Sequence, residues 1–258
     1  MTTVDFRSVK KVFSTKRGDV VALSEADLSI GDGEIVCLVG PSGCGKTTML
    51  NLTAGFLQPS QGQILVGGEV AGPPDASRAV VFQQDAVFPW LTVRRNIEYG
   101  PRMRGQDRSE FGPRAEHFMQ LVGLERFADA YPKELSGGMR KRVDLARAYV
   151  SNPDVLLMDE PFGALDVFTR EAMWDALHAG LRREPKTVLF VTHDIEEAIY
   201  IGDRIVMMTP RPAQVHREIP VPFPKERDLS LRATQEFQRL RHEIASEFAA
   251  LASGDHSE

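Results

Sequence analysis

A glycine-rich loop between a strand-like run and a helix-like run most constrains how this chain folds. The loop reads Gly40-Pro41-Ser42-Gly43-Cys44-Gly45-Lys46-Thr47. Residues 35–39 before it are continuously apolar, which is typical of a strand buried on both faces of a parallel sheet. Glycines let several backbone N–H groups point at one phosphate, and the helix predicted over 46–55 adds its positive dipole end. Lys46 brings a charge for the β and γ phosphates and Thr47 a hydroxyl for Mg²⁺, so the loop predicts a nucleotide triphosphate site.

A second apolar run ends in two adjacent carboxylates. Residues 155–158 are Val-Leu-Leu-Met, and Asp159, Glu160 and Pro161 follow. A strand that delivers Asp159 at its end can place this carboxylate near Mg²⁺, directly or through water. Glu160 beside a γ-phosphate can accept the proton of an attacking water or polarise it. This run therefore predicts hydrolysis of the nucleotide.

Between these two motifs lies a third anion-binding pattern, Ser136-Gly137-Gly138 in the string "LSGGMR". A serine hydroxyl and consecutive glycine N–H groups at a helix start form an anion site. A single chain has no obvious use for a second γ-phosphate site. Two chains arranged head to tail do, because each pattern then caps the other chain's nucleotide.

In this order, the motifs resemble those of the ATP-binding cassette (ABC) superfamily, from about Val4 to Met208. Gln83 resembles the Q-loop glutamine, which senses Mg²⁺ and links to the transporter partner. Asp166 in Ala164-Leu165-Asp166 resembles the D-loop residue at the dimer interface, and His193 resembles the switch histidine that contacts the γ-phosphate. The resemblance implies an α/β fold: a P-loop NTPase (RecA-like) core with an N-terminal antiparallel β subdomain and an inserted α-helical subdomain.

The same resemblance implies ATP and Mg²⁺ as ligands and gives roles to single residues. Glu160 becomes the catalytic base, with Lys46, Gln83 and His193 as further catalytic residues. The expected nucleotide contacts are Phe13, Gly40, Pro41, Ser42, Gly43, Cys44, Gly45, Lys46, Thr47, Thr48, Gln83, Ser136, Gly137, Gly138 and Asp166. The expected Mg²⁺ contacts are Thr47, Gln83 and Asp159. Phe13 takes the place of the aromatic that stacks on adenine and keeps a stacking face; the alternative is burial of Phe13 in the core.

Three strings narrow the resemblance to the nitrate, sulfonate and taurine importer branch: "LSGGMRKRV", "FPWLTVRRNI" and "DEPFGALD". Met139 departs from most signatures, which continue with Gln, but the Ser-Gly-Gly contacts survive. Membership implies a homodimer of ATP-binding subunits, membrane-embedded permease subunits and, indirectly, an extracytoplasmic solute-binding protein. The chain would then work at the cytoplasmic face of the cell membrane as a peripheral subunit.

Aromatic residues follow Gln83 in the segment Phe88-Pro89-Trp90-Leu91. Exposed aromatics there would suit a groove for a short permease helix. The alternative is that Trp90 packs inside the helical subdomain.

Strand and helix patterns predict the domain organisation. Strands are expected at 4–9, 20–23, 28–30, 35–39, 64–66, 79–82, 155–158, 188–191 and 205–208. Helical spacing at 94–99, 114–122 and 139–150 predicts a helical domain over 85–150, with a surface loop at 101–113. The α/β core is expected over 1–84 and 151–220. Residues 221–258 form a C-terminal extension with an amphipathic helix, capped by Ser230 and stopped by Gly254.

Composition excludes several other functions. The formal net charge of −5 gives no electrostatic footprint for a nucleic-acid backbone. No secretory signal or membrane-spanning run is evident, and the two cysteines, Cys37 and Cys44, suggest a reducing compartment rather than a disulfide. A soluble cassette ATPase of DNA repair or translation is the alternative function, but its coiled-coil insertion, zinc cysteines or second cassette are absent from the sequence. A regulatory module without turnover is disfavoured by Glu160 and His193.

Overall fold

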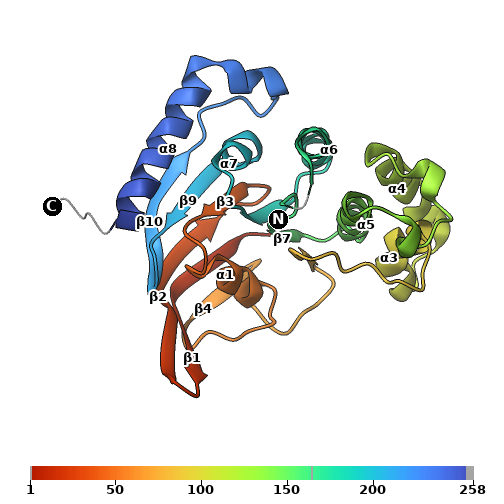
Figure 1. Ribbon diagram of the computed structural model, residues 1–258. Coiled ribbons are helices and arrows are strands. Elements are labelled where there is room, and N and C mark those ends of the chain that lie inside the picture. Colours follow the sequence, from red (N-terminus) through yellow and green to blue (C-terminus); the bar gives the residue numbers. More distant parts are fainter. Residues whose placement is uncertain (1, 164, 254–258) are drawn as a thin grey trace. The chain divides into compact units, whose positions relative to one another are not determined.

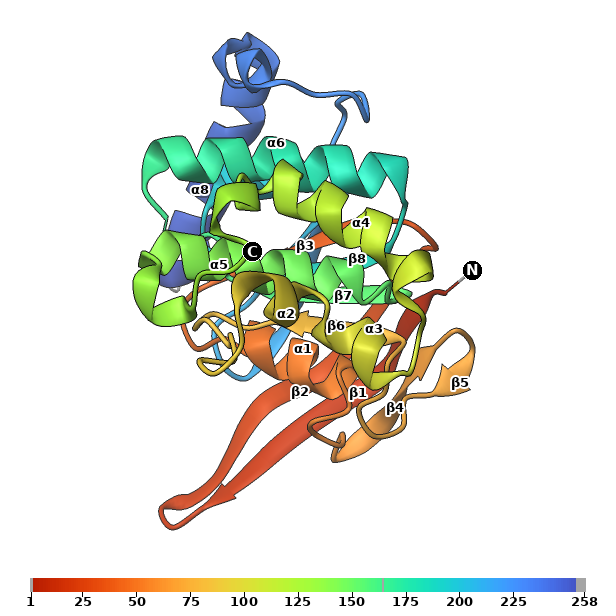
Figure 2. The same cartoon turned by 90° about the vertical axis from the view of Figure 1, so that its right-hand side faces the viewer.

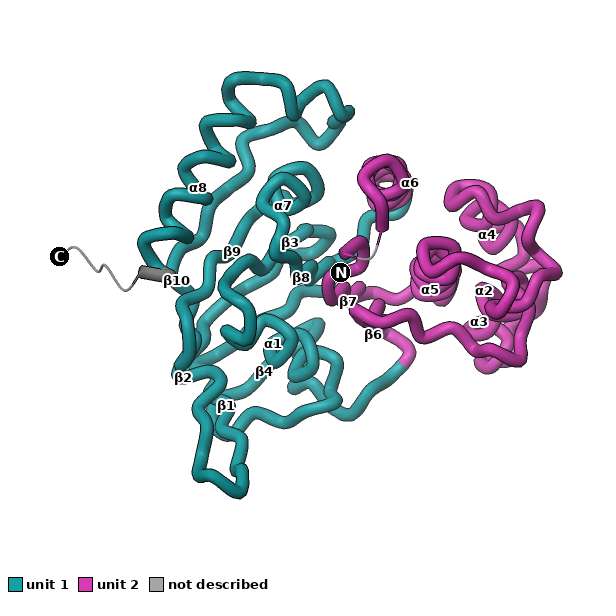
Figure 3. The backbone as a smooth tube through the Cα atoms, in the orientation of Figure 1, with its two compact units in different colours: residues 1–75, 184–258 teal, residues 76–183 magenta. Residues whose placement is uncertain are grey.

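A computed structural model describes residues 2–163 and 165–253 of the chain. The fold divides into two compact units, which Figure 3 colours separately: unit 1 comprises residues 1–75 and 184–258, and unit 2 comprises residues 76–183. These bounds differ from the predicted domain bounds at 84/85 and 150/151. The reason is that the strands at 78–81 and 155–159 pair with each other and belong to the same unit as the helices between them.

Unit 1 is built on a mixed sheet with the strand order β5-β4-β1-β2-β10-β9-β3-β8 (Figure 1). Its strands are β1 (Val4–Thr15), β2 (Gly18–Ile30), β3 (Ile35–Val39), β4 (Gln61–Val66), β5 (Glu69–Val70), β8 (Thr187–Val191), β9 (Arg204–Met208) and β10 (Ala213–Pro220). β1 pairs antiparallel with β2 and β4, whereas β3 lies parallel between β8 and β9. Every residue of β3 and β8 is buried, as their continuous apolar runs predict.

The helices of unit 1 are α1 (Lys46–Thr53), α7 (Ile195–Ile201), the 3-10 helix η3 (Leu229–Ala233) and α8 (Gln235–Ser253). α8 lies alongside β10 and buries Phe237, Ile244 and Leu251, which belong to its predicted apolar stripe. The prediction of Ser230 as the N-cap of this helix is wrong. The Asp228 carboxylate accepts the Ser230 N–H at 2.8 Å and caps η3 instead, while Gly254 lies outside the described residues.

Unit 2 pairs β6 (Arg78–Val81) in parallel with β7 (Val155–Asp159). Its helices are α2 (Val93–Ile97), α3 (Tyr99–Met103), α4 (Arg108–Leu121), α5 (Gly137–Val150) and α6 (Val167–Arg183), with 3-10 helices η1 (Glu125–Phe127) and η2 (Pro132–Glu134). Figure 2 shows α4, α5 and α6 running roughly parallel. Side chains from these helices and from β7 leave a cavity of only about 20 Å³ between them, so the helical layer has a well-packed core of its own.

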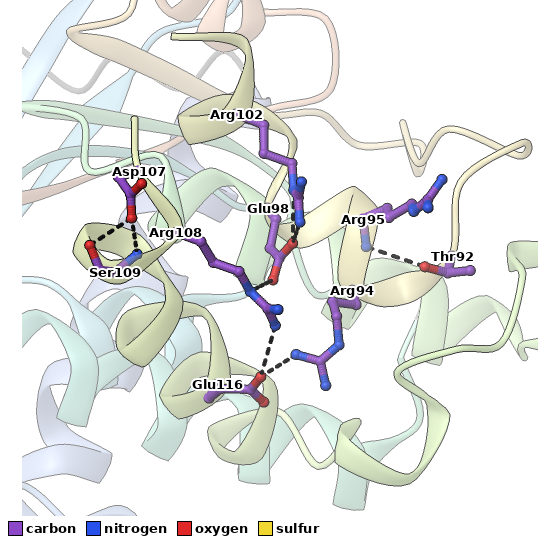
Figure 4. A network of polar contacts seen from close by, with 9 residues as sticks. All are labelled: Thr92, Arg94, Arg95, Glu98, Arg102, Asp107, Arg108, Ser109 and Glu116. Atoms are coloured by element: carbon purple, nitrogen blue, oxygen red, sulfur yellow. Dashed lines mark hydrogen bonds and ion pairs between the residues drawn. The ribbon is translucent and has the colours of Figure 1, made fainter. Parts of the chain in front are cut away.

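The prediction of a surface loop at 101–113 is wrong, because α3 and α4 occupy most of this range. Asp107 caps α4 by accepting the Ser109 N–H at 2.8 Å. The fully buried Glu98 accepts two bonds from Arg102, at 2.9 and 2.5 Å, and lies 3.6 Å from Arg108 (Figure 4). The Glu98–Arg108 ion pair ties α4 to the helices before it. Helix capping and this contact outweigh the arginine, glycine and proline content of the segment.

Two strand predictions also need correction. The strands expected at 20–23 and 28–30 form one continuous strand, β2. Between them, residues alternate between buried Ala26 and exposed Asp27, so the strand persists where the apolar run breaks. The proline-punctuated stretch after Pro210 contains β10, which the sequence did not predict.

Candidate active site

The phosphate loop joins β3 to α1 in unit 1, and three of its glycines are required by its shape. A Cβ on Gly40 would lie 2.8 Å from the Cys44 sulfur and 3.2 Å from Met208. Gly43 and Gly45 have φ values of +75° and +113°, a region that strains other residues. The backbone of this loop therefore turns tightly, with glycine where a side chain would clash or strain the chain.

Lys46 lies within this loop. Its side chain is buried, with 6% exposure, and Nζ donates to the carbonyl oxygens of Gly40 at 2.7 Å and Pro41 at 3.1 Å. α1 begins at Lys46 without an acidic residue in its first turn, so its positive end is not neutralised locally. A buried ammonium beside a helix N-terminus fits a polyphosphate chain. Thr47 is exposed and Thr48 half-buried at the same helix end.

Arg211 is a neighbour of this loop that the sequence did not reveal. Its Nε donates to the carbonyl oxygen of Gly43, and its Nη2 lies 3.0 Å from where a Gly43 Cβ would be. Arg211 follows β9, the parallel neighbour of β3. Because parallel strands end at the same edge of a sheet, knowledge of this strand order would have placed residues after β9 beside the loop.

Two further predicted residues lie on unit 1. His193 follows β8 and is exposed. The residue after it, Asp194, caps α7 by accepting the N–H groups of Glu196 at 2.9 Å and Glu197 at 3.2 Å. Phe13 is half-buried on β1, with the Lys11 Nζ 5.2 Å from the centroid of its ring. Phe13 is thus not part of the core, and that alternative is wrong.

The two carboxylates lie at the end of β7 in unit 2. Asp159 is 8% exposed, and Glu160 leaves the strand with a φ of +45°, which is uncommon for a residue with a side chain. The Gln83 Nε2 donates to the Glu160 Oε2 at 3.1 Å. The structure thus brings together two predicted catalytic residues that are distant in the sequence, and it holds one of them in a strained conformation of the kind found at functional sites.

Ser136 caps α5, as the sequence predicts. Its Oγ accepts the Met139 N–H at 3.2 Å, and Ser136 and Gly137 are exposed. Gly138 is half-buried, and a Cβ there would lie 3.1 Å from Leu165. The start of α5 at Ser136 and Gly137 is therefore accessible from outside the unit.

Asp166 directly precedes α6, and its carboxylate accepts the Thr169 N–H at 3.0 Å. Hydrogen bonds from Thr169 hold the pKa of Asp166 below its ordinary value. The carboxylate is thus charged at neutral pH and serves as a helix cap. Ala164 of the predicted D-loop lies outside the described residues.

The aromatic segment at 88–91 presents Trp90 to the outside of unit 2. Trp90 is 69% exposed, so the alternative that it packs inside the helical subdomain is wrong. The fully buried Asn96 fixes the segment: its Oδ1 accepts the Phe88 N–H, and its Nδ2 donates to three carbonyl oxygens. Phe88 of this segment also lines a pocket of about 260 Å³ in unit 2. The other lining residues include Arg78, Tyr99, Arg104, Arg147 and Ser151.

Comparison with known proteins identifies the family to which this chain belongs. Residues 23–163 match the sequence profile of the ABC transporter family. An ATP-binding protein of Brucella abortus (strain 2308) is 49% identical over 227 residues, which cover 88% of this chain and 87% of that protein. The taurine import ATP-binding protein TauB of Jannaschia sp. (strain CCS1) is 43% identical over 249 residues, which cover 95% of this chain and 93% of TauB.

Among solved structures, a dimeric structure of MJ0796, a bacterial ABC transporter cassette, aligns with a TM-score of 0.76 at 33% identity. It covers 86% of this chain and 100% of that one. A dimer of the same cassette in a post-hydrolysis state, bound to ADP and Pi, aligns with a TM-score of 0.75. The chain therefore belongs to the ABC transporter family, in its nitrate, sulfonate and taurine importer branch, and it is an ATPase that binds ATP.

Across residues 2–163 and 165–253, no helix is both long and apolar enough to cross a membrane. Over the same residues, no group of three or more His, Cys, Asp or Glu side chains is placed to hold a metal ion.

Proposed function

We propose that this ATPase hydrolyses ATP with Glu160 as the general base and with Gln83 as its direct partner. The hydrogen bond between these two side chains at the end of β7 carries the proposal. A carboxylate beside a γ-phosphate can accept the proton of an attacking water or polarise that water. Glu160 directly follows β7, and its left-handed backbone conformation ends the extended direction of that strand.

In unit 1, the phosphate loop binds and orients the substrate. Lys46 holds its ammonium against the loop carbonyls, where it can move to the β and γ phosphates. The exposed His193, which directly precedes the α7 cap Asp194, offers an imidazole to the γ-phosphate. Phe13 offers a half-exposed ring on which adenine can stack.

Thr47, Gln83 and Asp159 fit a magnesium ion as a hydroxyl, an amide oxygen and a carboxylate. Mg²⁺ prefers such oxygen ligands and retains several waters, so it does not need a cluster of acidic residues. Because the Gln83 amide nitrogen donates to Glu160, its oxygen stays available as a ligand. When bound, the ion neutralises charge that develops on the phosphate oxygens.

The functional unit is a head-to-tail homodimer in which Ser136, Gly137 and Gly138 cap the nucleotide of the other subunit. The exposed helix start at Ser136 supports this assignment, and so do the dimers formed by the MJ0796 cassette. ATP held between two subunits stabilises the closed dimer, and hydrolysis removes that stabilisation. Asp166 lies on the D-loop of the same interface.

The dimer drives uptake of a small solute through separate permease subunits at the cytoplasmic face of the membrane. Exposed Trp90 and the neighbouring pocket of about 260 Å³ suit a short permease helix. TauB relatives are taurine import proteins, so a taurine-like sulfonate, delivered by an extracytoplasmic solute-binding protein, is the proposed cargo. The alternative, a soluble ATPase of DNA repair or translation, is not favoured by these relatives.

Replacement of Glu160 tests the assignment of the base. Glu160→Gln keeps the shape and the bond to Gln83 but cannot take a proton. We expect the variant to bind ATP, form a persistent dimer with ATP and lose turnover by about 10²-fold or more. Nucleotide binding, light scattering and phosphate release measure these three properties. Undiminished phosphate release would remove Glu160 from the role of base.

Replacement of Trp90 tests the docking surface. Trp90→Asp should weaken recovery of the permease with the tagged chain while ATP binding stays near the wild-type value. Val70→Asp is a matched control, because Val70 is 64% exposed and lies on unit 1. Equal permease recovery with both variants would refute the docking role.

A further inference from the structure

Side chains on one face of α5 bind residues 82–88. This segment contains Gln83 of the Q-loop and ends at Phe88, the first residue of the aromatic segment 88–91. The contacts come from Arg140, Lys141, Asp144 and Arg147, whose spacing places them on one side of the helix. α5 also starts at the Ser136 cap. A single helix therefore carries the signature at its first turn and holds the Q-loop along its side.

Lys141 makes the contact closest to Gln83. Its side chain is buried, with 2% exposure, and Nζ donates to the backbone carbonyl oxygens of Phe82 and, at 3.2 Å, of Gln83. Burial lowers the pKa of Lys141, so the protein bears a cost to keep the ammonium there. Next to it, the Arg140 Nε donates to the Asp85 carboxylate at 2.9 Å.

The following turns of α5 fix the rest of the segment. The Asp144 carboxylate is 1% exposed, accepts the Ala86 N–H and lies 2.5 Å from the Arg147 guanidinium. Burial raises the pKa of Asp144, against the opposing effect of Arg147. Arg147 donates to the Ala86 carbonyl at 2.7 Å and stands 5.0 Å from the centroid of the Phe88 ring.

Buried charges of this kind contribute little net stability, because desolvation offsets the attraction between them. These charged side chains instead fix the position of one short segment, because Lys141, Asp144 and Arg147 all form hydrogen bonds with backbone groups of residues 82–86. In particular, the two carbonyls held by Lys141 flank the Cα of Gln83 on either side. They set the direction in which its side chain leaves the backbone toward Glu160.

From these contacts, we infer that Lys141 is a positioning residue for Gln83, so that the signature helix and the Q-loop move as one body. The inference rests on the proposed function of Gln83 and Glu160. ATP bound at the signature would then reorient Gln83 together with residues 88–91, the proposed docking segment, through side chains of α5.

The test measures ATP turnover as a function of Mg²⁺ concentration in the full-length chain. Lys141→Met keeps the aliphatic stem and removes the donors. Lys141→Gln is a neutral donor that reaches nearly as far, whereas the amide of Lys141→Asn is too short to reach the carbonyls. Lys133→Met, at an exposed lysine, is the control. ATP binding and thermal unfolding are measured for every variant.

Loss of one charge-assisted hydrogen bond predicts a turnover about tenfold lower for Lys141→Met and Lys141→Asn, with a raised Mg²⁺ half-saturation. ATP affinity should stay within about twofold of wild type, because Lys141 acts on the backbone of Phe82 and Gln83. Lys141→Gln should restore most of both parameters. Should Lys141→Met fail to fold, Lys141→Asn carries the test.

Two results would overturn the inference: an unchanged Mg²⁺ dependence in folded Lys141→Asn, or a Lys141→Gln variant as impaired as Lys141→Asn. Gln83→Ala is the reference. If it leaves turnover and Mg²⁺ dependence unchanged, the proposed role of Gln83 fails by itself. If Gln83→Ala is impaired, the double variant with Lys141→Asn should be no worse than Gln83→Ala alone; additive losses would show that Lys141 does not act through Gln83.

Discussion

Asn96 offers a direct way to separate the docking segment from the rest of unit 2. Its amide nitrogen lies 3.1, 3.0 and 3.0 Å from the carbonyl oxygens of Phe88, Leu91 and Thr92, which share its two N–H donors, and its oxygen accepts the Phe88 N–H at 2.7 Å. The side chain is fully buried, so no solvent competes for these bonds. Asn96→Ala removes all four bonds at once.

A net hydrogen bond between neutral groups contributes about 1 kcal/mol, and some of the released backbone groups regain water at the half-buried segment. The expected loss of unfolding free energy is therefore about 2–4 kcal/mol, or about 5–10 °C in melting temperature for a chain of this size. Asn96→Asp should cost more, because an ionised carboxylate cannot donate to three carbonyls. Recovery of the permease should fall with both variants, since Trp90 loses its fixed backbone.

Chemical unfolding followed by fluorescence measures the stability, and affinity purification of the complex measures permease recovery. Gln120→Ala is the control, because Gln120 is exposed on α4. If Asn96→Ala unfolds within about 0.5 kcal/mol of that control, the four bonds do not hold the segment. Unchanged permease recovery in a destabilised Asn96→Ala variant would refute the link between segment order and docking.

Four further predictions concern other parts of the chain. Gly45→Ala should lower ATP affinity by about tenfold or more in an equilibrium binding assay, because its Cβ would lie 3.2 Å from the Ala22 carbonyl oxygen at a φ of +113°; unchanged affinity would contradict the loop geometry. Glu98→Ala should lower the free energy of unfolding by only about 1–2 kcal/mol, since Arg102 and Arg108 are exposed enough to regain water. Glu110→Ala, at an exposed site on α4, is the control. A loss for Glu98→Ala no larger than for this control would show that the ion pairs are not needed. Asp166→Ala should reduce stability at pH 7, and because the folded pKa of Asp166 is lowered, the difference from wild type should vanish as the pH falls through that pKa; a difference that persists in acid would disprove the cap. Thiol titration of the native protein at pH 8 should detect neither Cys37 nor Cys44, because both are buried and burial raises the pKa of Cys37, whereas the denatured protein should show two thiols.

The parts of the fold that the sequence predicts are those where one local pattern decides the structure. The runs at 35–39 and 188–191 are apolar without interruption and become fully buried strands. Ser136 caps a helix because its hydroxyl precedes a helix start and accepts a backbone N–H there. In these places, propensity, burial and capping agree.

Elsewhere, tertiary contacts override the local pattern. Pro113 lies inside α4, where Asp107 caps the helix start and Phe111 and Phe118 are buried. In the active site, the motifs identified Gln83 and Glu160 but not the bond between them or the left-handed backbone of Glu160. Arg211 and Lys141 were missed because their partners are backbone carbonyls distant in the sequence, and such contacts leave no pattern in a single chain.

Mixed dimers test most directly whether each signature acts on the nucleotide of the other subunit. Lys46→Met removes the phosphate-loop charge and Ser136→Arg blocks the signature, so each variant alone should lose ATP turnover. In a mixed dimer, the intact phosphate loop of the Ser136→Arg chain meets the intact signature of the Lys46→Met chain. We predict that a 1:1 mixture recovers turnover, up to about a quarter of the wild-type rate, because half of the dimers are mixed and each has one intact site. No recovery at any mixing ratio would contradict the head-to-tail arrangement.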